Sequence, residues 1–124
     1  MVLRSDPVEV WGTGEDVRDL IYIDDFLDGL LKAFHVDEPY LAINICSGDG
    51  IRVLDILKTA AKVDGFDTID VRLDPSKPST VPVRRLSAKL AEEKLGFKSK
   101  IDLDEGCKRT MAWYRKNPQP EDSK

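Results

Sequence analysis

The residues that could do chemistry begin with an aromatic and a cationic side chain on either side of a turn. Trp11 and Arg18 flank a Gly-Thr-Gly sequence at positions 12–14. A guanidinium offers a planar fork of N–H donors that matches phosphate oxygens, and an indole ring can stack on a base. The pair therefore suits a nucleoside diphosphate. A plainer interpretation stays open, in which Trp11 packs in a core or an interface and Arg18 pairs with Asp19 or Asp24.

A second candidate lies between residues 74 and 85, where three prolines exclude both a helix and a central strand. The prolines hold the chain in a fixed shape at little entropic cost. The stretch supplies cations and hydroxyls that could close over an anionic ligand, namely Lys77, Ser79, Thr80, Arg84 and Arg85. The alternative is a solvated basic strip on the surface.

Other chemistry finds little support. The Gly-x-Gly turn is not a dinucleotide fingerprint, because Val17 occupies the position of the last required glycine and a strand follows. The single histidine, His35, lies on a predicted amphipathic helix without a Ser/His/Asp set. Cys46 and Cys107 are far apart in sequence, so we expect two reduced thiols. We predict no catalytic, cofactor-binding or metal-ligating residue.

The composition is typical of one soluble domain, with 124 residues, 41% apolar and 34% charged. We expect one folded domain over residues 1–117 and a disordered polar tail over residues 118–124. A formal net charge of -4 without a long basic run argues against nucleic-acid or anionic-membrane partners. No apolar run approaches the roughly 18 residues of a membrane span, and the first residues do not resemble a signal peptide, so we expect a cytoplasmic protein.

Strands and helices are expected to alternate, which indicates an α/β fold. Short strands are predicted at 8–11, 18–23, 41–46 and 68–73, where β-branched and aromatic residues end at turns. Helices are predicted from a cap at Asp24 or Asp25 to Pro39, over 53–63, from a Ser87 cap to Gly96, and from an Asp102–Glu105 capping box to Pro118. The first helix carries an apolar stripe that we expect to be buried, composed of Phe26, Leu27, Leu30, Leu31 and Phe34. The strand at 41–46 is expected to be covered on both faces.

The order of several motifs resembles the extended short-chain dehydrogenases/reductases, a family of nucleotide-sugar epimerases, dehydratases and reductases. Residues 10–25 resemble its W-G-x-G and R-D/E-hydrophobic-Y/H-V-D-D signature, and residues 43–45 resemble its I-N-V-G strand. Further matches resemble its K-P-x-x-x-P-x-R, L-G-F/W and L-E-E-G segments, at residues 77–84, 94–97 and 103–106. Within the family, the chain is most similar to the GDP-L-fucose synthase-like enzymes. It departs from them at Ser79, in a loop that commonly reads K-P-D-G, and at Cys46, where glycine is usual.

The resemblance implies the C-terminal, substrate-binding part of such an enzyme, with the Rossmann nucleotide-binding half absent. It implies that Trp11 stacks on a nucleoside, that Arg18 and Arg84 bind a diphosphate, and that Lys77 and Ser79 close a loop over a nucleotide sugar. The family's Gly-rich NAD(P) fingerprint and its Tyr-x-x-x-Lys pair are both missing. We therefore expect no cofactor in this chain and NAD or NADP in the parent enzyme, and whether the chain is itself an enzyme stays open.

The leading hypothesis is the substrate-binding portion of an NAD(P)-dependent nucleotide-sugar epimerase, dehydratase or reductase, not catalytic on its own. The alternative is a stand-alone binding or assembly module of the same fold. The expected partners are a nucleoside-diphosphate sugar and the N-terminal Rossmann domain of the parent. The apolar stripe and residues 41–46 look suited to packing against that domain, so the isolated chain is also expected to self-associate.

Overall fold

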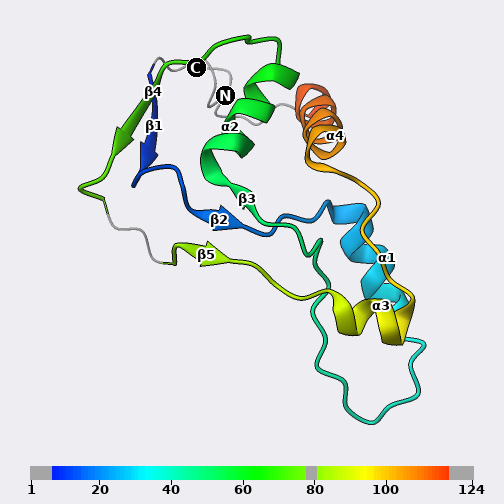
Figure 1. Cartoon of the computed structure of the whole chain (residues 1–124). Helices are drawn as coiled ribbons and strands as arrows, with labels where there is room; N and C mark the ends of the chain where they lie inside the picture. The colour runs from blue at the N-terminus through cyan, green and yellow to red at the C-terminus, as the bar shows by residue number, and fades with distance from the viewer. Residues whose placement is uncertain (1–6, 78–80, 118–124) are drawn as a thin grey trace.

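The computed structural model describes residues 7–77 and 81–117 (Figure 1). Strands and helices are interspersed along the chain, which confirms the α/β prediction. In chain order the elements are β1 (Val8–Trp11), β2 (Val17–Arg18), α1 (Ile23–Ala33), β3 (Ile51–Arg52), α2 (Val53–Val63), β4 (Val71–Asp74), β5 (Val83–Arg84), α3 (Lys89–Leu95) and α4 (Leu103–Lys116). None of the helices among the described residues is long and apolar enough to cross a membrane.

The strands form two small sheets. In the first, β1 pairs with β4 in parallel, from Val8 opposite Val71 to Trp11 opposite Asp74. In the second, β2 lies between β3, which is antiparallel to it, and β5, which is parallel. The prediction of one strand over residues 18–23 is wrong, because β2 ends at Arg18 and α1 already begins at Ile23. The first two strands follow each other in sequence but belong to different sheets.

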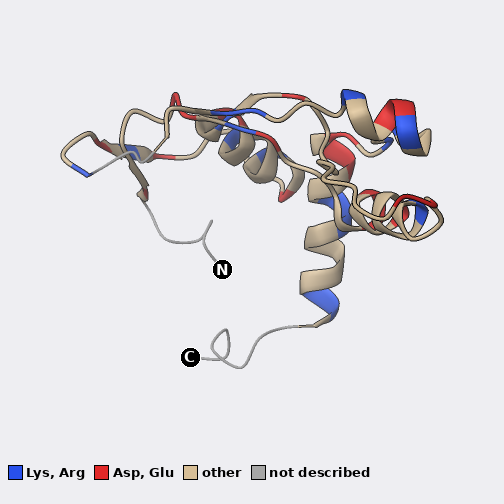
Figure 2. Cartoon of the chain, turned by 90° about the horizontal axis from the view of Figure 1, so that it is seen from below, with Lys and Arg blue, Asp and Glu red and all other residues tan. Residues whose placement is uncertain are grey.

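Short-range sequence patterns predict the extent of α2 and the start of α4 correctly. The apolar spacing predicted a helix over residues 53–63, which is the observed extent of α2. The Asp102 carboxylate accepts a hydrogen bond from the Glu105 N–H at 2.9 Å, so the predicted cap of α4 is confirmed. Figure 2 shows α4 projecting away from the strands, with acidic and basic positions interspersed along the helices.

The start of α3 lies one residue beyond the predicted cap. The residue before α3 is Ala88, while the Ser87 hydroxyl accepts from the Lys89 N–H at 3.4 Å. Gly96 ends the helix as predicted, in the left-handed conformation at φ 58°.

The predicted cap and the predicted buried face of α1 are both wrong. Tyr22 precedes the helix without a side-chain capping bond, and Asp25 lies in the first turn, where it is buried. The helix turns Gly29 inward, since a Cβ there would lie 2.5 Å from Ile45 Cγ2 and 3.1 Å from Phe97 Cδ2. The apolar stripe of α1 is exposed, with side chains between 37% and 76% accessible. Periodicity locates an apolar face, but it does not say which neighbour covers it.

The run at 41–46 is not a strand, contrary to the prediction. No neighbouring strand pairs with it within the described residues. Its burial alternates, with Ala42 and Asn44 exposed and Cys46 only 2% accessible, so one face is covered rather than two. A strand needs a partner for its backbone groups, and an apolar sequence alone does not supply one.

Candidate functional site

Most of the predicted site residues lie at the two ends of the connection between β4 and β5. At the β4 end, Lys77 Nζ lies 5.5 Å from the centroid of the Trp11 ring. At the β5 end, Arg84 lies opposite Arg18 on the neighbouring strand. β4 belongs to the first sheet and β5 to the second (Figure 1). The structure therefore brings Trp11 to Lys77 and Arg18 to Arg84. Ser79 lies outside the described residues, as does the predicted tail at 118–124.

Trp11 is a surface residue. Its side chain is 62% exposed, and its indole Nε1 donates to Glu9 Oε1 at 3.0 Å. The interpretation of Trp11 as a core residue is therefore wrong for this chain. An exposed indole beside a lysine ammonium has a face that can accept either a cation or a flat ring.

Arg18 is held firmly, although not by the partners that the sequence suggested. One terminal nitrogen donates to the carbonyls of Val17 and Val81, both at 2.8 Å. The other donates to Asp16 Oδ2 at 2.9 Å, in an ion pair that is partly buried. These three bonds engage three of the five N–H donors of a guanidinium. The side chain is thus oriented in advance and keeps donors for a ligand.

Arg84 has more freedom than Arg18. It is exposed, and no hydrogen bond or ion pair joins its guanidinium to another described residue. Because β2 and β5 are parallel and in register, the side chains of Arg18 and Arg84 leave the same face of the sheet. Two like charges on neighbouring strands repel each other, and an anion between them relieves that repulsion.

The carboxylates of Asp19 and Asp25 hold this part of the chain together. From the sequence, Asp19 was a possible partner of Arg18 and Asp25 a possible helix cap. Asp19 Oδ1 accepts from the N–H and hydroxyl of Ser47 at 3.0 and 2.8 Å, and Asp19 Oδ2 accepts from the Gly48 N–H at 3.0 Å. Asp25 Oδ2 accepts from the Ser99 hydroxyl at 3.0 Å and from the N–H groups of Lys100 and Ile101 at 2.9 Å. Such contacts join distant segments, and no local sequence signal reveals them.

The pKa of Asp25 is lowered from its ordinary value. Burial acts in the opposite direction, but the N–H groups of Ile101 and Lys100 and the Ser99 hydroxyl together outweigh it. Asp25 is therefore a buried carboxylate that stays ionised because the backbone solvates it. Its role is structural, since its acceptors are turned toward the segment that leads into α4.

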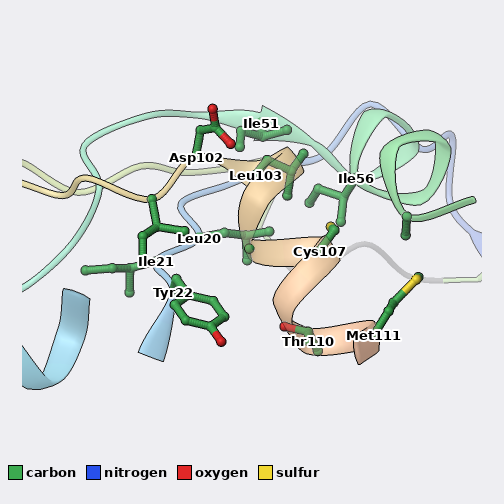
Figure 3. Close-up of a pocket in the computed structure, with 13 residues that line it drawn as sticks. Leu20, Ile21, Tyr22, Ile51, Ile56, Asp102, Leu103, Cys107, Thr110 and Met111 are labelled. Atoms are coloured by element: carbon green, nitrogen blue, oxygen red, sulfur yellow. The ribbon is translucent and has the colours of Figure 1, made fainter. Parts of the chain in front are cut away.

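An apolar cavity of about 300 Å³ lies between α2, α4, Ile51 of β3 and the segment that joins β2 to α1, away from the predicted site (Figure 3). Tyr22, Cys107 and Met111 line it, and none of Trp11, Arg18, Lys77 and Arg84 does. Burial raises the pKa of the Cys107 thiol, which keeps it protonated and a poor nucleophile. The cavity therefore offers apolar packing rather than catalysis. No cluster of three or more His, Cys, Asp or Glu side chains that could hold a metal ion forms among the described residues.

The glycine turn does not fit a dinucleotide cofactor. Gly12 and Gly14 have φ values of 80° and 75°, but the turn leads into β2 rather than into a helix. A pyrophosphate cradle needs the N-terminus of a helix behind the glycines. We therefore assign no pyrophosphate contact to this turn.

The fold and the sequence are shared with a nucleotide-sugar enzyme of known structure. The UDP-glucose 4-epimerase of Thermotoga maritima, solved with UDP-glucose, is similar with a TM-score of 0.82 and 33% identity. The match covers 95% of this chain and 38% of the other. The chain is a relative of the NAD-dependent epimerase/dehydratase family. The model of that family matches residues 1–46, which include Trp11 and Arg18.

Other relatives in the NAD-dependent epimerase/dehydratase family match this chain with similar identity and coverage. The probable GDP-L-fucose synthase 1 of Oryza sativa subsp. japonica is 31% identical over 110 residues, 89% of this chain and 33% of its own length. The UDP-glucose 4-epimerase of Bifidobacterium longum, solved with NAD+ and UDP, has a TM-score of 0.80 at 28% identity, over 92% of this chain and 36% of its own. The chain thus spans about a third of the length of these relatives. This confirms the family resemblance, and the partial match fits the C-terminal part that the motifs indicate.

Proposed function

We propose that this chain is the portion of an NAD(P)-dependent nucleotide-sugar epimerase, dehydratase or reductase that binds the nucleoside-diphosphate sugar. The observation that carries the proposal is the register of Arg18 with Arg84 on one face of the second sheet. Two guanidinium groups side by side match the two negative phosphates of a nucleoside diphosphate. The solved relatives that hold UDP-glucose, or UDP with NAD+, support a ligand of this class.

Each residue has a role that follows from its place. Arg18, already oriented by Asp16, and Arg84, which is exposed, bind the diphosphate. Trp11 stacks on the base, and the Lys77 ammonium beside its ring either moves aside or contacts the nearest phosphate. Ser79 belongs to the proposal through the family resemblance alone.

The chain by itself is proposed to bind and not to catalyse. The hydride transfer of such enzymes needs a nicotinamide cofactor and a positioned acid or base. In this sequence no tyrosine has a lysine four residues on, because Phe26, Asn44 and Pro118 occupy those positions. The cofactor and the acid/base group are then supplied by the part of the family's length that this chain does not span.

The exposed stripe of α1 is the proposed contact with that remaining part, a dinucleotide-binding domain. Relatives of the chain are about three times as long as the matched region, so a further domain is available to cover the stripe. Five large apolar side chains on one face of one helix are more than isolated surface exposure explains.

A calorimetric titration with GDP-, UDP- and dTDP-sugars tests the proposed binding. Weak binding is expected, and Arg18→Ala should remove roughly 1.5–3 kcal/mol of it, the usual contribution of hydrogen bonds to a charged group. Arg115→Ala serves as the control, because that arginine is on α4 and pairs with Asp64. Equal affinities of wild type and Arg18→Ala would exclude the assigned phosphate contact.

A further inference from the structure

Asp19 lies where three segments meet, next to Arg18 in the chain. Besides the turn at Ser47 and Gly48, its carboxylate accepts from the Leu86 N–H at 3.4 Å, and its own N–H donates to the Arg84 carbonyl at 3.0 Å. Asp19 therefore holds the chain directly after the side chain of Arg84, through its backbone N–H at the Arg84 carbonyl and through its carboxylate at the Leu86 N–H, two residues later.

This hold is needed because the pairing of β2 with β5 is short. Each strand has two residues, and the flanking bond from the Val17 N–H to the Pro82 carbonyl is 2.7 Å long. A ladder this short makes few backbone hydrogen bonds, and β5 is at the edge of its three-stranded sheet, so it has no strand on its other side among the described residues. The carboxylate of Asp19 extends the contact beyond the ladder and fixes the register of Arg84 with Arg18.

The same arrangement separates the two adjacent arginines. Arg85 Nε donates to the Gly48 carbonyl at 2.8 Å, and the Gly48 N–H donates to Asp19 Oδ2. Arg85 is therefore tied to the turn that Asp19 holds, while Arg84 stays beside Arg18. The sequence alone offers Arg84 and Arg85 equally, and the structure gives them different surroundings.

We infer that Asp19 is a positioning residue that keeps Arg84 in register with Arg18 for the diphosphate, an inference that rests on the proposed function. Asparagine cannot replace it, because a carboxylate accepts at both oxygens, whereas an amide presents an NH2 group to two of the donors. Asp19→Asn thus keeps the shape of the side chain. Its NH2 group, however, faces either the Ser47 donors or the N–H groups of Gly48 and Leu86, and cannot accept from them.

Asp25 provides a matched control. It loses the same charge in Asp25→Asn, but its hydrogen bonds from Ser99, Lys100 and Ile101 all go to Oδ2, so the amide oxygen can still accept them. Asp25→Ala removes those bonds and lowers stability without touching the arginines. Asp25→Asn therefore tests a loss of charge, Asp25→Ala a loss of stability, and Asp19→Asn a loss of register between Arg18 and Arg84.

The experiment combines residue-resolved amide exchange with titration of GDP and UDP-glucose, on folded protein. Asp19→Asn is expected to speed exchange of the Val17 and Asp19 amides by about tenfold, because local opening controls their protection. It should weaken nucleotide binding by about tenfold, the loss that one charge-assisted contact accounts for. Asp25→Asn should keep these exchange rates and the nucleotide affinity within about twofold of the wild type. Asp25→Ala should lower the melting temperature and leave the affinity unchanged.

Unchanged exchange at Val17 and Asp19 in Asp19→Asn would overturn the positioning role, whatever the nucleotide does. Faster amide exchange in Asp19→Asn together with wild-type nucleotide affinity would also overturn the positioning role, because the register of the two arginines would then not matter for the ligand. Failure of the proposed function has a different signature. The wild type and Arg18→Ala would bind GDP and UDP-glucose equally or not at all, while the exchange readout would still decide whether Asp19 holds Arg84 in place.

Discussion

Two helical regions of this protein carry apolar stripes of similar regularity and differ in what covers them. One face of α4, formed by Leu103, Cys107, Met111 and Tyr114, is half-buried, and α2 packs against this helix. The stripe of α1 faces outward, while Gly29 and Asp25 face inward. The difference shows that a regular apolar stripe in the sequence does not determine whether the described chain buries it.

The largest expected effect compares two phenylalanines. Phe97 is 1% exposed and lies under Gly29, whereas Phe34 on the α1 stripe is 76% exposed. Phe97→Ala should destabilise the fold by about 3–5 kcal/mol, the usual cost of a cavity at a fully buried aromatic. Phe34→Ala should change the free energy of unfolding by less than about 0.5 kcal/mol at dilutions where the chain is monomeric. Denaturant unfolding measures both, and equal losses would show that α1 is buried in the isolated chain after all.

The second prediction concerns what the open stripe does in solution. The isolated chain should self-associate through α1, because burying each large apolar side chain contributes about 1.5–3 kcal/mol. Leu31→Glu with Phe34→Glu should give a monomer, whereas Trp113→Ser, at an exposed tryptophan on α4, should not. Sedimentation at several concentrations is the measurement. A wild-type chain that stays monomeric at every concentration would contradict this interpretation of α1.

The third prediction uses pH to sharpen the contrast between the inner and outer faces of α1. The pKa of Asp25 is lower in the fold than in the unfolded chain, so its ionised form stabilises the fold above the ordinary carboxyl range. That stability should disappear as the pH falls below about 4, where an unfolded aspartate takes up its proton. Asp25→Ala should cost roughly 1.5–3 kcal/mol at neutral pH and flatten the acid limb. An identical acid profile for the mutant and the wild type would refute the assignment.

The smallest expected effect compares the two helix starts. Asp102 caps α4 through the Glu105 N–H, so Asp102→Ala should cost about 1 kcal/mol. Asp24 makes no capping bond at the start of α1, and its contact with Arg109 is a surface ion pair at 3.7 Å. Asp24→Ala should therefore change the free energy of unfolding by about 0.5 kcal/mol or less. Thermal unfolding of the two variants distinguishes them, and similar losses would restore Asp24 as a cap.

What could be predicted from the sequence follows the range of each signal. The extent of α2, the cap at Asp102 and the end of α3 at Gly96 depend on residues a few positions apart, and all were predicted correctly. The pairing of β1 with β4 joins segments about sixty residues apart. Apolar patterning specifies a strand but not its partner, which is why residues 41–46 were misassigned.

The candidate site shows the same limit. The residue types at Trp11, Arg18 and Arg84 pointed to a phosphate ligand, because guanidinium and indole chemistry can be inferred from the residue alone. The actual partner of Arg18 is Asp16, two residues away, while Asp19 turns to the backbone of residues 47, 48 and 86. A carboxylate beside an arginine in sequence can point either way, and tertiary contacts decide which.

The division of the strands into two separate sheets affects how the protein unfolds when a ligand is bound. The two sheets share no strand pairing among the described residues, and the connection between β4 and β5 begins in one and ends in the other. A ligand held by Trp11 on the first sheet and by Arg18 and Arg84 on the second would act as a non-covalent cross-link between them. Binding to the folded state alone raises its stability in proportion to the logarithm of the ligand concentration. The two sheets would then lose their structure in a single cooperative transition when the ligand is present.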